Sequence, residues 1–322
     1  MLALAAVWTA AGAGRRLVAI ADLHGDLHAG VRVLKLAGLV DDRQHWAGGD
    51  AVLVQTGDIV DRGGEAKQLY ELFQRLAAEA AGRGGAVHNL LGNHDIMNML
   101  GDVRYVNKSD YAHFGGAKAR ARAFSAAGEL GQWLRSLPVA LRLGDTVFVH
   151  AGITPEWAAL GIDGINARTR AALGPSAGMS SRSSILGSNG PVWYRGYDQD
   201  GEARACATVR QALHLLGGTR MVVGHSIQDD RVRVRCAGQL HLIDIAMSSA
   251  IYGEHVVAWE CVGCLELGGD GSGAREREAS GAELPRAEPG GDVRIRAVYD
   301  DSVVPLLTGV PRLREDLRLR RH

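Results

Sequence analysis

The stretch "AVHNLLGNHD", residues 86–95, contains the pattern from which the fold of this chain follows. An apolar run that predicts a buried strand ends directly in Asn93, His94 and Asp95. A single cluster of this kind is compatible with an ordinary capped turn. Its meaning therefore depends on whether other strands of the chain end in the same way.

Four further apolar runs also carry polar side chains at their carboxyl ends. The runs are "RLVAIADLHGD" (16–26), "DAVLVQTGDIVDRG" (50–63), "DTVFVHAG" (145–152) and "TRMVVGHS" (219–226). The polar residues at these ends are Asp22, His24, Asp26, Asp58, Asp61, Arg62, His150 and His225. Each cluster alone is more often a cap, a turn or a structural histidine than a ligand. Together, and in this order, they indicate one shared site.

The segments between the runs predict helices. "HAGVRVLKLAGL" (28–39) and "EAKQLYELFQRLAAEAAGRG" (65–84) place apolar residues at helical spacing. Near-continuous apolar strands that alternate with helices are typical of a largely parallel sheet covered by helices. Ligands bind such sheets beyond the carboxyl ends of the strands. We therefore expect all five strand ends to lie at the same edge of one sheet.

The rest of the chain divides by composition. Residues 96–138 lack a strand signal and predict helices, for which a position beside the site and an insertion on the surface are equally compatible. Alternating residues around Ala237-Gly238 predict an antiparallel hairpin, with Arg231, Arg233 and Arg235 on a solvated face. The predicted organisation is an unassigned segment (1–15), a domain that holds the site (16–262), a low-complexity linker (263–292) and a C-terminal tail (293–322).

Charge and cysteine content exclude several classes of protein. The chain has 36 basic and 36 acidic residues, so no net field attracts nucleic acid or an anionic membrane. No apolar stretch is long enough to span a bilayer. The four cysteines are too few and scattered for a disulfide framework, and Cys261 and Cys264 are predicted to be ordinary cysteines. We expect a soluble cytoplasmic protein, with organellar targeting by the N-terminal residues as the alternative.

The combination D-x-H, GD-x-x-DR, GNHD, VHAG and GHS resembles the calcineurin-like metallophosphoesterase superfamily over residues 16–260. GD-x-x-DRG belongs with its phosphoprotein phosphatase type. The stretches "HGDLHAGVRVLKLAGL", "MNMLGDVRYV", "GPVWYRGY" and "VVGHSIQ" look most like Shewanella-like protein phosphatases. The resemblance implies a four-layer α/β/β/α sandwich, with mixed sheets flanked by helices and a metal site at the carboxyl ends of the strands.

The resemblance also implies two divalent metal ions. Matching motifs places Asp22, His24 and Asp58 on one metal, with Asp58 bridging to the other. The second metal would be held by Asn93, His150 and His225. Three imidazoles favour Mn, Fe or Zn, with Co also suitable, over the oxygen-seeking Ca. A metal pair with only two anionic ligands keeps a positive charge that attracts phosphate.

Further roles follow from the same match. His94 is the expected general acid and Asp61 the carboxylate that orients it. Arg62 would clamp the phosphoryl oxygens, and Arg195 is a candidate second clamp for which a structural role is equally compatible. Asp95 stands where phosphoprotein phosphatases carry glutamate, a departure that leaves the metal ligands untouched.

These features predict a metal-dependent phosphoprotein phosphatase. The expected substrate is a phosphoprotein or phosphopeptide carrying phosphoserine, phosphothreonine or phosphotyrosine, attacked in line by hydroxide held by the metal pair. A small-molecule phosphoesterase, such as a dinucleoside polyphosphatase, is the second enzyme hypothesis. A non-catalytic phosphate-binding scaffold is the third, against which the intact ligand set and His94 argue.

Overall fold

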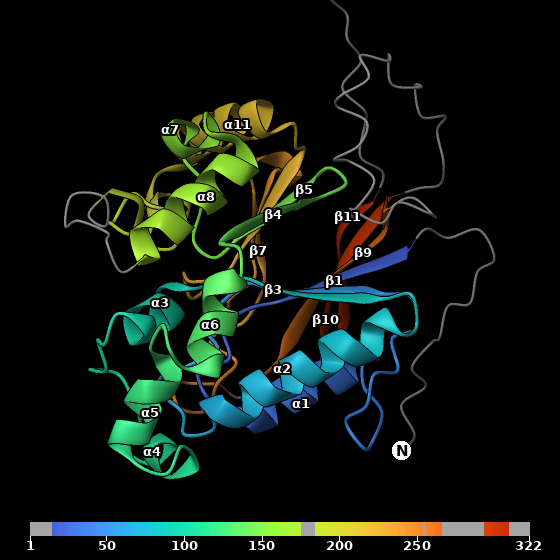
Figure 1. Ribbon diagram of the computed structural model, residues 1–322. Helices are drawn as coiled ribbons and strands as arrows, with labels where there is room; N and C mark the ends of the chain where they lie inside the picture. Colours follow the sequence, from blue (N-terminus) through green and yellow to red (C-terminus); the bar gives the residue numbers. More distant parts are fainter. Residues whose placement is uncertain (1–14, 175–183, 254, 266–292, 309–322) are drawn as a thin grey trace, which may run out of the picture.

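The computed structural model describes residues 15–174, 184–253, 255–265 and 293–308. Figure 1 shows two β-sheets between two groups of helices. One group includes α1 (Leu27–Leu36) and α2 (Ala66–Ala81), and the other includes α8 (Gly161–Leu173) and α11 (Glu202–Leu216). Both sheets are mixed, with parallel and antiparallel pairs. This arrangement confirms the predicted four-layer α/β/β/α class.

The first sheet has six strands in the order β11-β10-β9-β1-β2-β3. Strands β1, β2 and β3 are parallel, whereas β9, β10 and β11 join in antiparallel fashion. The strands span Arg15–Ile20 (β1), Val52–Gln55 (β2), Ala86–Asn89 (β3), Val257–Leu265 (β9), Arg294–Tyr299 (β10) and Val303–Thr308 (β11). Residues 52–55 of β2 are buried throughout, as expected for a central parallel strand covered on both faces.

The second sheet has five strands in the order β4-β5-β6-β8-β7. Strands β5, β6 and β8 are parallel, and β4 and β7 are antiparallel edges. The strands span Ala140–Leu143 (β4), Thr146–Val149 (β5), Arg220–Val223 (β6), Arg233–Arg235 (β7) and Leu240–Leu242 (β8). The two sheets face one another at Phe148 and Trp259, whose ring centroids are 5.9 Å apart.

Helices cover the outer faces. Helix α1 (Leu27–Leu36) begins at Asp26, whose carboxylate accepts a hydrogen bond from the Ala29 amide as an N-cap. Helix α2 (Ala66–Ala81) buries Leu69, Phe73, Leu76 and Ala80 at helical spacing. The remaining helices are α3 (Asn93–Met99), α4 (Asp110–His113), α5 (Ala117–Phe124), α6 (Glu129–Ser136), α7 (Pro155–Ala158), α8 (Gly161–Leu173), α10 (Gly196–Gln199), α11 (Glu202–Leu216) and the 3₁₀ turn η1 (Cys236–Gly238).

The expectation that all five strand ends belong to one sheet was wrong. Strands β1, β2 and β3 belong to the first sheet, but the strands that precede His150 and His225 belong to the second. Between the two sets, the chain passes through α3 and then through helices α4 to α6 of the 96–138 segment before it enters the second sheet at β4. Strand–helix alternation identifies each strand but carries no signal for which sheet the strand joins.

The hairpin around Ala237-Gly238 is confirmed, because β7 and β8 pair in antiparallel fashion. The prediction that Arg231, Arg233 and Arg235 share a solvated face is not confirmed. Arg235 is buried and donates to a carboxylate oxygen of Glu202 and to three backbone carbonyls, whereas Arg233 is exposed. The β7 edge strand packs Arg235 against the start of α11, which residue alternation alone does not reveal.

The prediction of a C-terminal tail from residue 293 was wrong for residues 294–308. They form β10 and β11, and β10 pairs with β9 along six residues. Glu260 on β9 joins this hairpin to β1, since its carboxylate is 2.7 Å from the guanidinium of Arg16 and 2.7 Å from that of Arg296. The rest of the predicted tail and most of the predicted linker lie outside the described residues.

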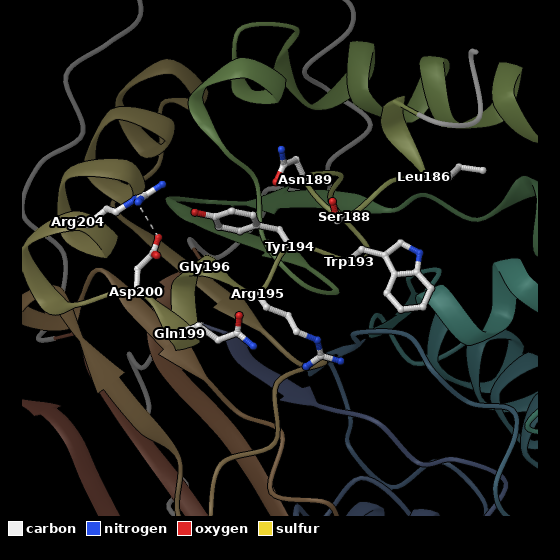
Figure 2. A pocket seen from close by; sticks show the side chains of 10 residues that line it. All are labelled: Leu186, Ser188, Asn189, Trp193, Tyr194, Arg195, Gly196, Gln199, Asp200 and Arg204. Atoms are coloured by element: carbon white, nitrogen blue, oxygen red, sulfur yellow. Dashed lines mark ion pairs between the residues drawn. The ribbon is translucent and has the colours of Figure 1, made fainter. Parts of the chain in front are cut away.

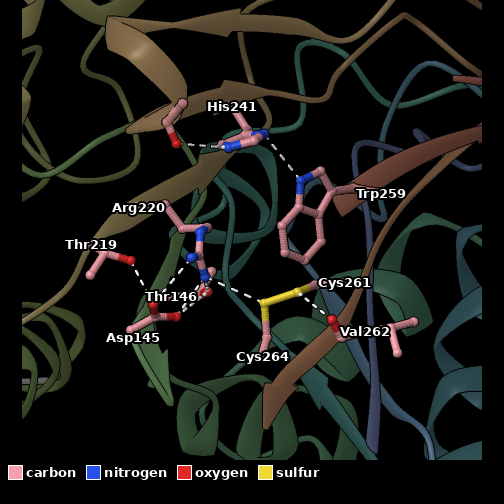
Figure 3. Close-up of a disulfide and its surroundings, with 10 residues drawn as sticks. Asp145, Thr146, Thr219, Arg220, His241, Trp259, Cys261, Val262 and Cys264 are labelled. Carbon is pink, nitrogen blue, oxygen red and sulfur yellow. Dashed lines mark hydrogen bonds and ion pairs between the residues drawn. A yellow bond between two sulfur atoms is a disulfide. The ribbon is translucent and has the colours of Figure 1, made fainter. Parts of the chain in front are cut away.

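The prediction of ordinary cysteines was also wrong. Cys206 on α11 is disulfide-bonded to Cys236 in η1, and Cys261 is bonded to Cys264 within β9. Figure 3 shows the second bond beside Arg220, whose Nη1 lies 3.3 Å from Cys264 Sγ. Spacing missed both pairs because Cys206 and Cys236 meet only through the tertiary fold, and four cysteines are compatible with several pairings or none.

Within the described ranges, every helix falls short of the length and apolar character that a bilayer crossing requires.

Candidate metal centre

Five strand ends from two sheets converge on one buried cluster. The loops after β1, β2 and β3 bring Asp22, His24, Asp58 and Asn93, and the residues that follow β5 and β6 are His150 and His225. All six side chains are buried. The sheets also meet here through a hydrogen bond, because the His225 backbone amide donates to Asp22 Oδ1 at 3.2 Å. The structure thus brings together every metal ligand that the motifs predict.

The first half of the cluster surrounds His24. Its Nε2 lies 3.8 Å from an oxygen of Asp22 and 3.8 Å from an oxygen of Asp58. Its Nδ1 donates to the Val60 carbonyl at 3.1 Å, which leaves the Nε2 lone pair facing the two carboxylates. Burial lowers the pKa of His24 to about 4, so the ring is neutral, the state that ligates metals.

The second half surrounds His150. Its Nε2 lies 2.9 Å from Asn93 Oδ1, 3.1 Å from His225 Nδ1 and 3.4 Å from the same Asp58 oxygen that faces His24. Its Nδ1 donates to the Thr56 carbonyl at 3.0 Å. Burial, and then the neighbouring His150, lower the pKa of His225 to about 2. Asp58 is the residue shared by both halves.

The donor set fits divalent cations. Ring nitrogens, an amide oxygen and carboxylate oxygens point at one another, and acceptors packed in this way repel unless a cation lies between them. Among the described residues, neither Asp22 nor Asp58 forms an ion pair with lysine or arginine. Burial, followed by the charges of Asp244 and Asp58, raises the pKa of Asp22 well above its usual range.

The backbone around the cluster is strained where the ligands are presented. Positive φ angles of 42°, 56° and 64° occur at His24, Asp58 and His225. Such angles are uncommon for side-chain-bearing residues and gather at functional sites. Gly92 is required for close approach, because a Cβ there would lie 2.1 Å from Asp58 Oδ1. The loops are therefore shaped around the cluster.

A histidine–carboxylate pair borders the cluster. His94 Nδ1 is 2.7 Å from Asp61 Oδ2, and the His94 backbone amide donates to Asp58 Oδ1 at 2.9 Å. Burial lowers the pKa of His94, but the charge of Asp58 and the Asp61 hydrogen bond outweigh it, so the net shift is upward. The ring is thereby held protonated on Nδ1, with Nε2 directed away from Asp61. This is the geometry a general acid requires.

Comparison with known proteins identifies the family. Residues 15–228 match the family described as calcineurin-like phosphoesterase. The chain belongs to the calcineurin-like phosphoesterase family. This phosphoesterase is a hydrolase acting on phosphoric esters, and the family implies divalent metals.

Three similar proteins show which members of the family this phosphoesterase resembles. An uncharacterized protein of Schizosaccharomyces pombe is 36% identical over 255 residues, which cover 74% of this chain and 75% of that protein. Shewanella-like protein phosphatase 2 of Arabidopsis thaliana is 32% identical over 279 residues, covering 72% and 71%. The crystal structure of the cold-active protein-tyrosine phosphatase of a psychrophilic Shewanella species superposes with a TM-score of 0.71 at 27% identity, covering 91% of this chain and 80% of that one. The Shewanella-like resemblance is confirmed.

Arg62 is presented at the mouth of the phosphoesterase site. Its guanidinium lies 4.2 Å from the centroid of the Tyr105 ring, and the same ring is 5.1 Å from the ring of His94. Arg62 is exposed and has no ion-pair partner among the described residues. Tyr105 therefore orients both Arg62 and His94. Tyr105 lies within the stretch "MNMLGDVRYV", but no role was predicted for it from the sequence.

Arg195 lies on the opposite flank. Its Nη1 donates to the His225 carbonyl at 3.2 Å, and the neighbouring Trp193 ring packs edge-on against His225 at 5.8 Å. The guanidinium is exposed, so it is free to contact an anion at the metal centre. Each flank of the site thus has an arginine beside an aromatic ring that touches an active-site histidine.

Sequence reasoning missed two supporting groups. Asn98 and Arg120 come from the 96–138 segment: Asn98 Nδ2 donates to Asp61 Oδ1 at 2.9 Å, and Arg120 Nη1 donates to Asn98 Oδ1 at 2.7 Å. Arg120 is fully buried and paired with Asp110 at 2.7 Å. No local pattern signals this chain of contacts, because its members lie on separate turns and helices.

Asp244 was missed despite an available signal. It follows β8 in "LHLID", so it ends a strand in the same way as the ligands do. Burial raises its pKa to about 6, and its charge in turn raises the pKa of Asp22.

The structure also shows what Asp95 contacts. Its carboxylate accepts hydrogen bonds from the Asp58 amide at 2.8 Å and from the Tyr70 hydroxyl at 2.5 Å. The aspartate that replaces glutamate thus braces the loop that carries Asp58.

Proposed function

We propose that this phosphoesterase is a phosphoprotein phosphatase that hydrolyses phosphomonoesters of phosphoserine, phosphothreonine or phosphotyrosine. The observation that carries the proposal is Asp58, whose one carboxylate oxygen faces His24 in one half of the cluster and His150 in the other. Two cations bound on either side of Asp58 would share it as a bridging ligand. The protein phosphatases among its relatives supply the substrate class.

We assign the ligands as follows. Asp22, His24 and Asp58 would hold one divalent ion, and Asp58, Asn93, His150 and His225 would hold the other. Mn, Fe and Zn suit the three imidazoles best. Two such metal ions would lower the pKa of a bound water, so that it can act as the nucleophile, and would neutralise the phosphoryl charge.

The chain's own residues complete the reaction. Arg62 binds phosphoryl oxygens with its planar guanidinium, and Arg195 contacts them from the opposite flank. His94 holds a proton for the leaving oxygen, and Asp61 keeps that ring in the tautomer and orientation required. Tyr105 limits the motion of Arg62 by stacking on it.

Turnover of a phosphopeptide panel, measured with Mn²⁺ and compared with turnover of a dinucleoside polyphosphate, tests the proposal. We expect phosphopeptides to be the better substrates. His94→Asn should slow their hydrolysis by about 10²–10⁴-fold while the metal content is unchanged. Faster hydrolysis of the dinucleoside polyphosphate would favour the small-molecule hypothesis, and a metal-loaded protein inert towards every ester would contradict both.

A further inference from the structure

A pocket with a volume of about 530 Å³ adjoins the metal centre. Its lining comes from residues 186–204, from the segment after α8 to the first turn of α11. Figure 2 shows Trp193 at one side and the Arg204–Asp200 pair at the other, with Tyr194 and Arg195 between them. Trp193 and Arg195 are also the residues that touch His225. A substrate whose phosphoryl group lies on the metal centre therefore reaches this pocket directly.

The lining suits a polypeptide. Trp193 and Tyr194 offer large aromatic surfaces that stay rigid on binding. Ser188, Asn189 and Gln199 are exposed on the lining. Their side chains make no hydrogen bond to other described residues and are therefore available to a ligand. Unpaired amide groups both donate and accept, which matches the alternating N–H and C=O groups of an extended backbone.

The pocket carries an excess of positive charge, which would favour some peptides over others. Arg195 has no ion-pair partner among the described residues, and Arg204 pairs with Asp200 at 3.3 Å while its side chain stays 81% exposed. Two arginines against one aspartate leave an excess positive charge on the lining. An acidic side chain in the pocket would complement that charge.

We propose that this pocket binds the polypeptide segment beside the phosphorylated residue and prefers an acidic side chain there. The proposal rests on the proposed phosphoprotein phosphatase function. An extended chain advances about 3.3 Å per residue, so the acidic position lies within a few residues of the phosphorylated one. Arg204, on the first turn of α11, is the specificity-determining residue.

The test compares paired phosphopeptides that differ only by Glu or Gln, scanned in turn through about four positions on either side of the phosphorylated residue. For wild type, we expect kcat/KM at one or two positions to be about three- to tenfold higher with Glu than with Gln. The ratio of the two values does not depend on how much enzyme is active, so a partly unfolded variant cannot mimic the effect.

Three variants locate the effect. Arg204→Glu should remove or invert the preference for Glu, and Asp200→Asn should enlarge it. Arg210→Glu is the matched control, because Arg210 is exposed on the same helix outside the pocket lining and its replacement should leave the ratio unchanged.

Hydrolysis of all peptides with equal kcat/KM, or an unchanged ratio in Arg204→Glu, would overturn the subsite while leaving the proposed function intact. Failure to hydrolyse any phosphopeptide, with p-nitrophenyl phosphate still turned over, would overturn the proposed function itself. Hydrolysis of a dinucleoside polyphosphate that depends on Arg204 would assign the pocket to a nucleotide and overturn its assignment to a peptide.

Discussion

Asn98 Nδ2 donates a 2.9 Å hydrogen bond to Oδ1 of Asp61, the carboxylate oxygen that does not hold His94. Asn98 also donates to the His94 carbonyl at 2.9 Å, and its own oxygen is held by the buried Arg120. Asn98 and Arg120 thus support the orientation of His94 through Asp61, and neither contacts a proposed metal ligand. Asn98 is a positioning residue, and its effect should depend on the leaving group.

Asn98→Ala should slow hydrolysis of phosphoserine peptides by about tenfold or more, part of the 10²–10⁴-fold supplied by a general acid. Hydrolysis of p-nitrophenyl phosphate should fall much less, because its good leaving group needs little protonation. Steady-state kcat values for the two substrates give the comparison. Asn166→Ala is the control, since Asn166 is a buried asparagine that binds the backbone of β4. An equal loss on both substrates for Asn98→Ala would contradict the positioning role.

Asp58→Asn should lower occupancy at both metal positions, because one Asp58 oxygen faces both halves of the cluster. Elemental analysis of the purified variant measures the metal-to-protein ratio. Asp26→Asn is the matched control: Asp26 caps α1, and asparagine caps helices equally well. Retention of two metal ions by Asp58→Asn would refute the bridging assignment.

Reduction of Cys206–Cys236 should lower the free energy of unfolding by about 3–4 kcal/mol, and reduction of Cys261–Cys264 by less, because the loop that each closes differs in length. Their sequence separations are 30 and 3 residues. Urea unfolding of Cys206→Ser and Cys264→Ser variants, against wild type in non-reducing buffer, measures both. Equal losses would show that loop closure is not the dominant effect.

Glu260→Gln should destabilise the fold in a pH-dependent manner. Burial raises the pKa of Glu260, but hydrogen bonding to Arg296 and the charge of Arg16 outweigh it, so the pKa in the folded state is lowered. A lowered pKa stabilises the fold above the pKa of the unfolded chain, about 4.3, and that stabilisation is lost as the pH falls further.

At pH 7 we expect Glu260→Gln to lower the unfolding free energy by about 1–3 kcal/mol. The difference from wild type should shrink below about pH 4, where the glutamate becomes protonated. Urea unfolding of both proteins at pH 7 and below about pH 4 measures this difference in unfolding free energy. A difference that does not change with pH would mean that Glu260 contributes through packing and not through its charge.

Several helices and strands, and the proposed metal ligands, could be read from short patterns. Helices α1 and α2 follow from apolar spacing, and Asp22, His24, Asp58, Asn93, His150 and His225 each follow an apolar run. A strand end and its first polar residues are encoded within about ten residues, so local reasoning reaches them.

Only the tertiary structure decided how those pieces combine. The assignment of each strand to one of the two sheets, the pairing of β10 with β9, both disulfides and the Asn98–Arg120 support of Asp61 were not predicted. Each joins residues on different elements, and such contacts form because side chains must fill a common interior and buried polar groups must find partners. Local sequence determines what each segment presents at its end, whereas packing determines which segment it faces.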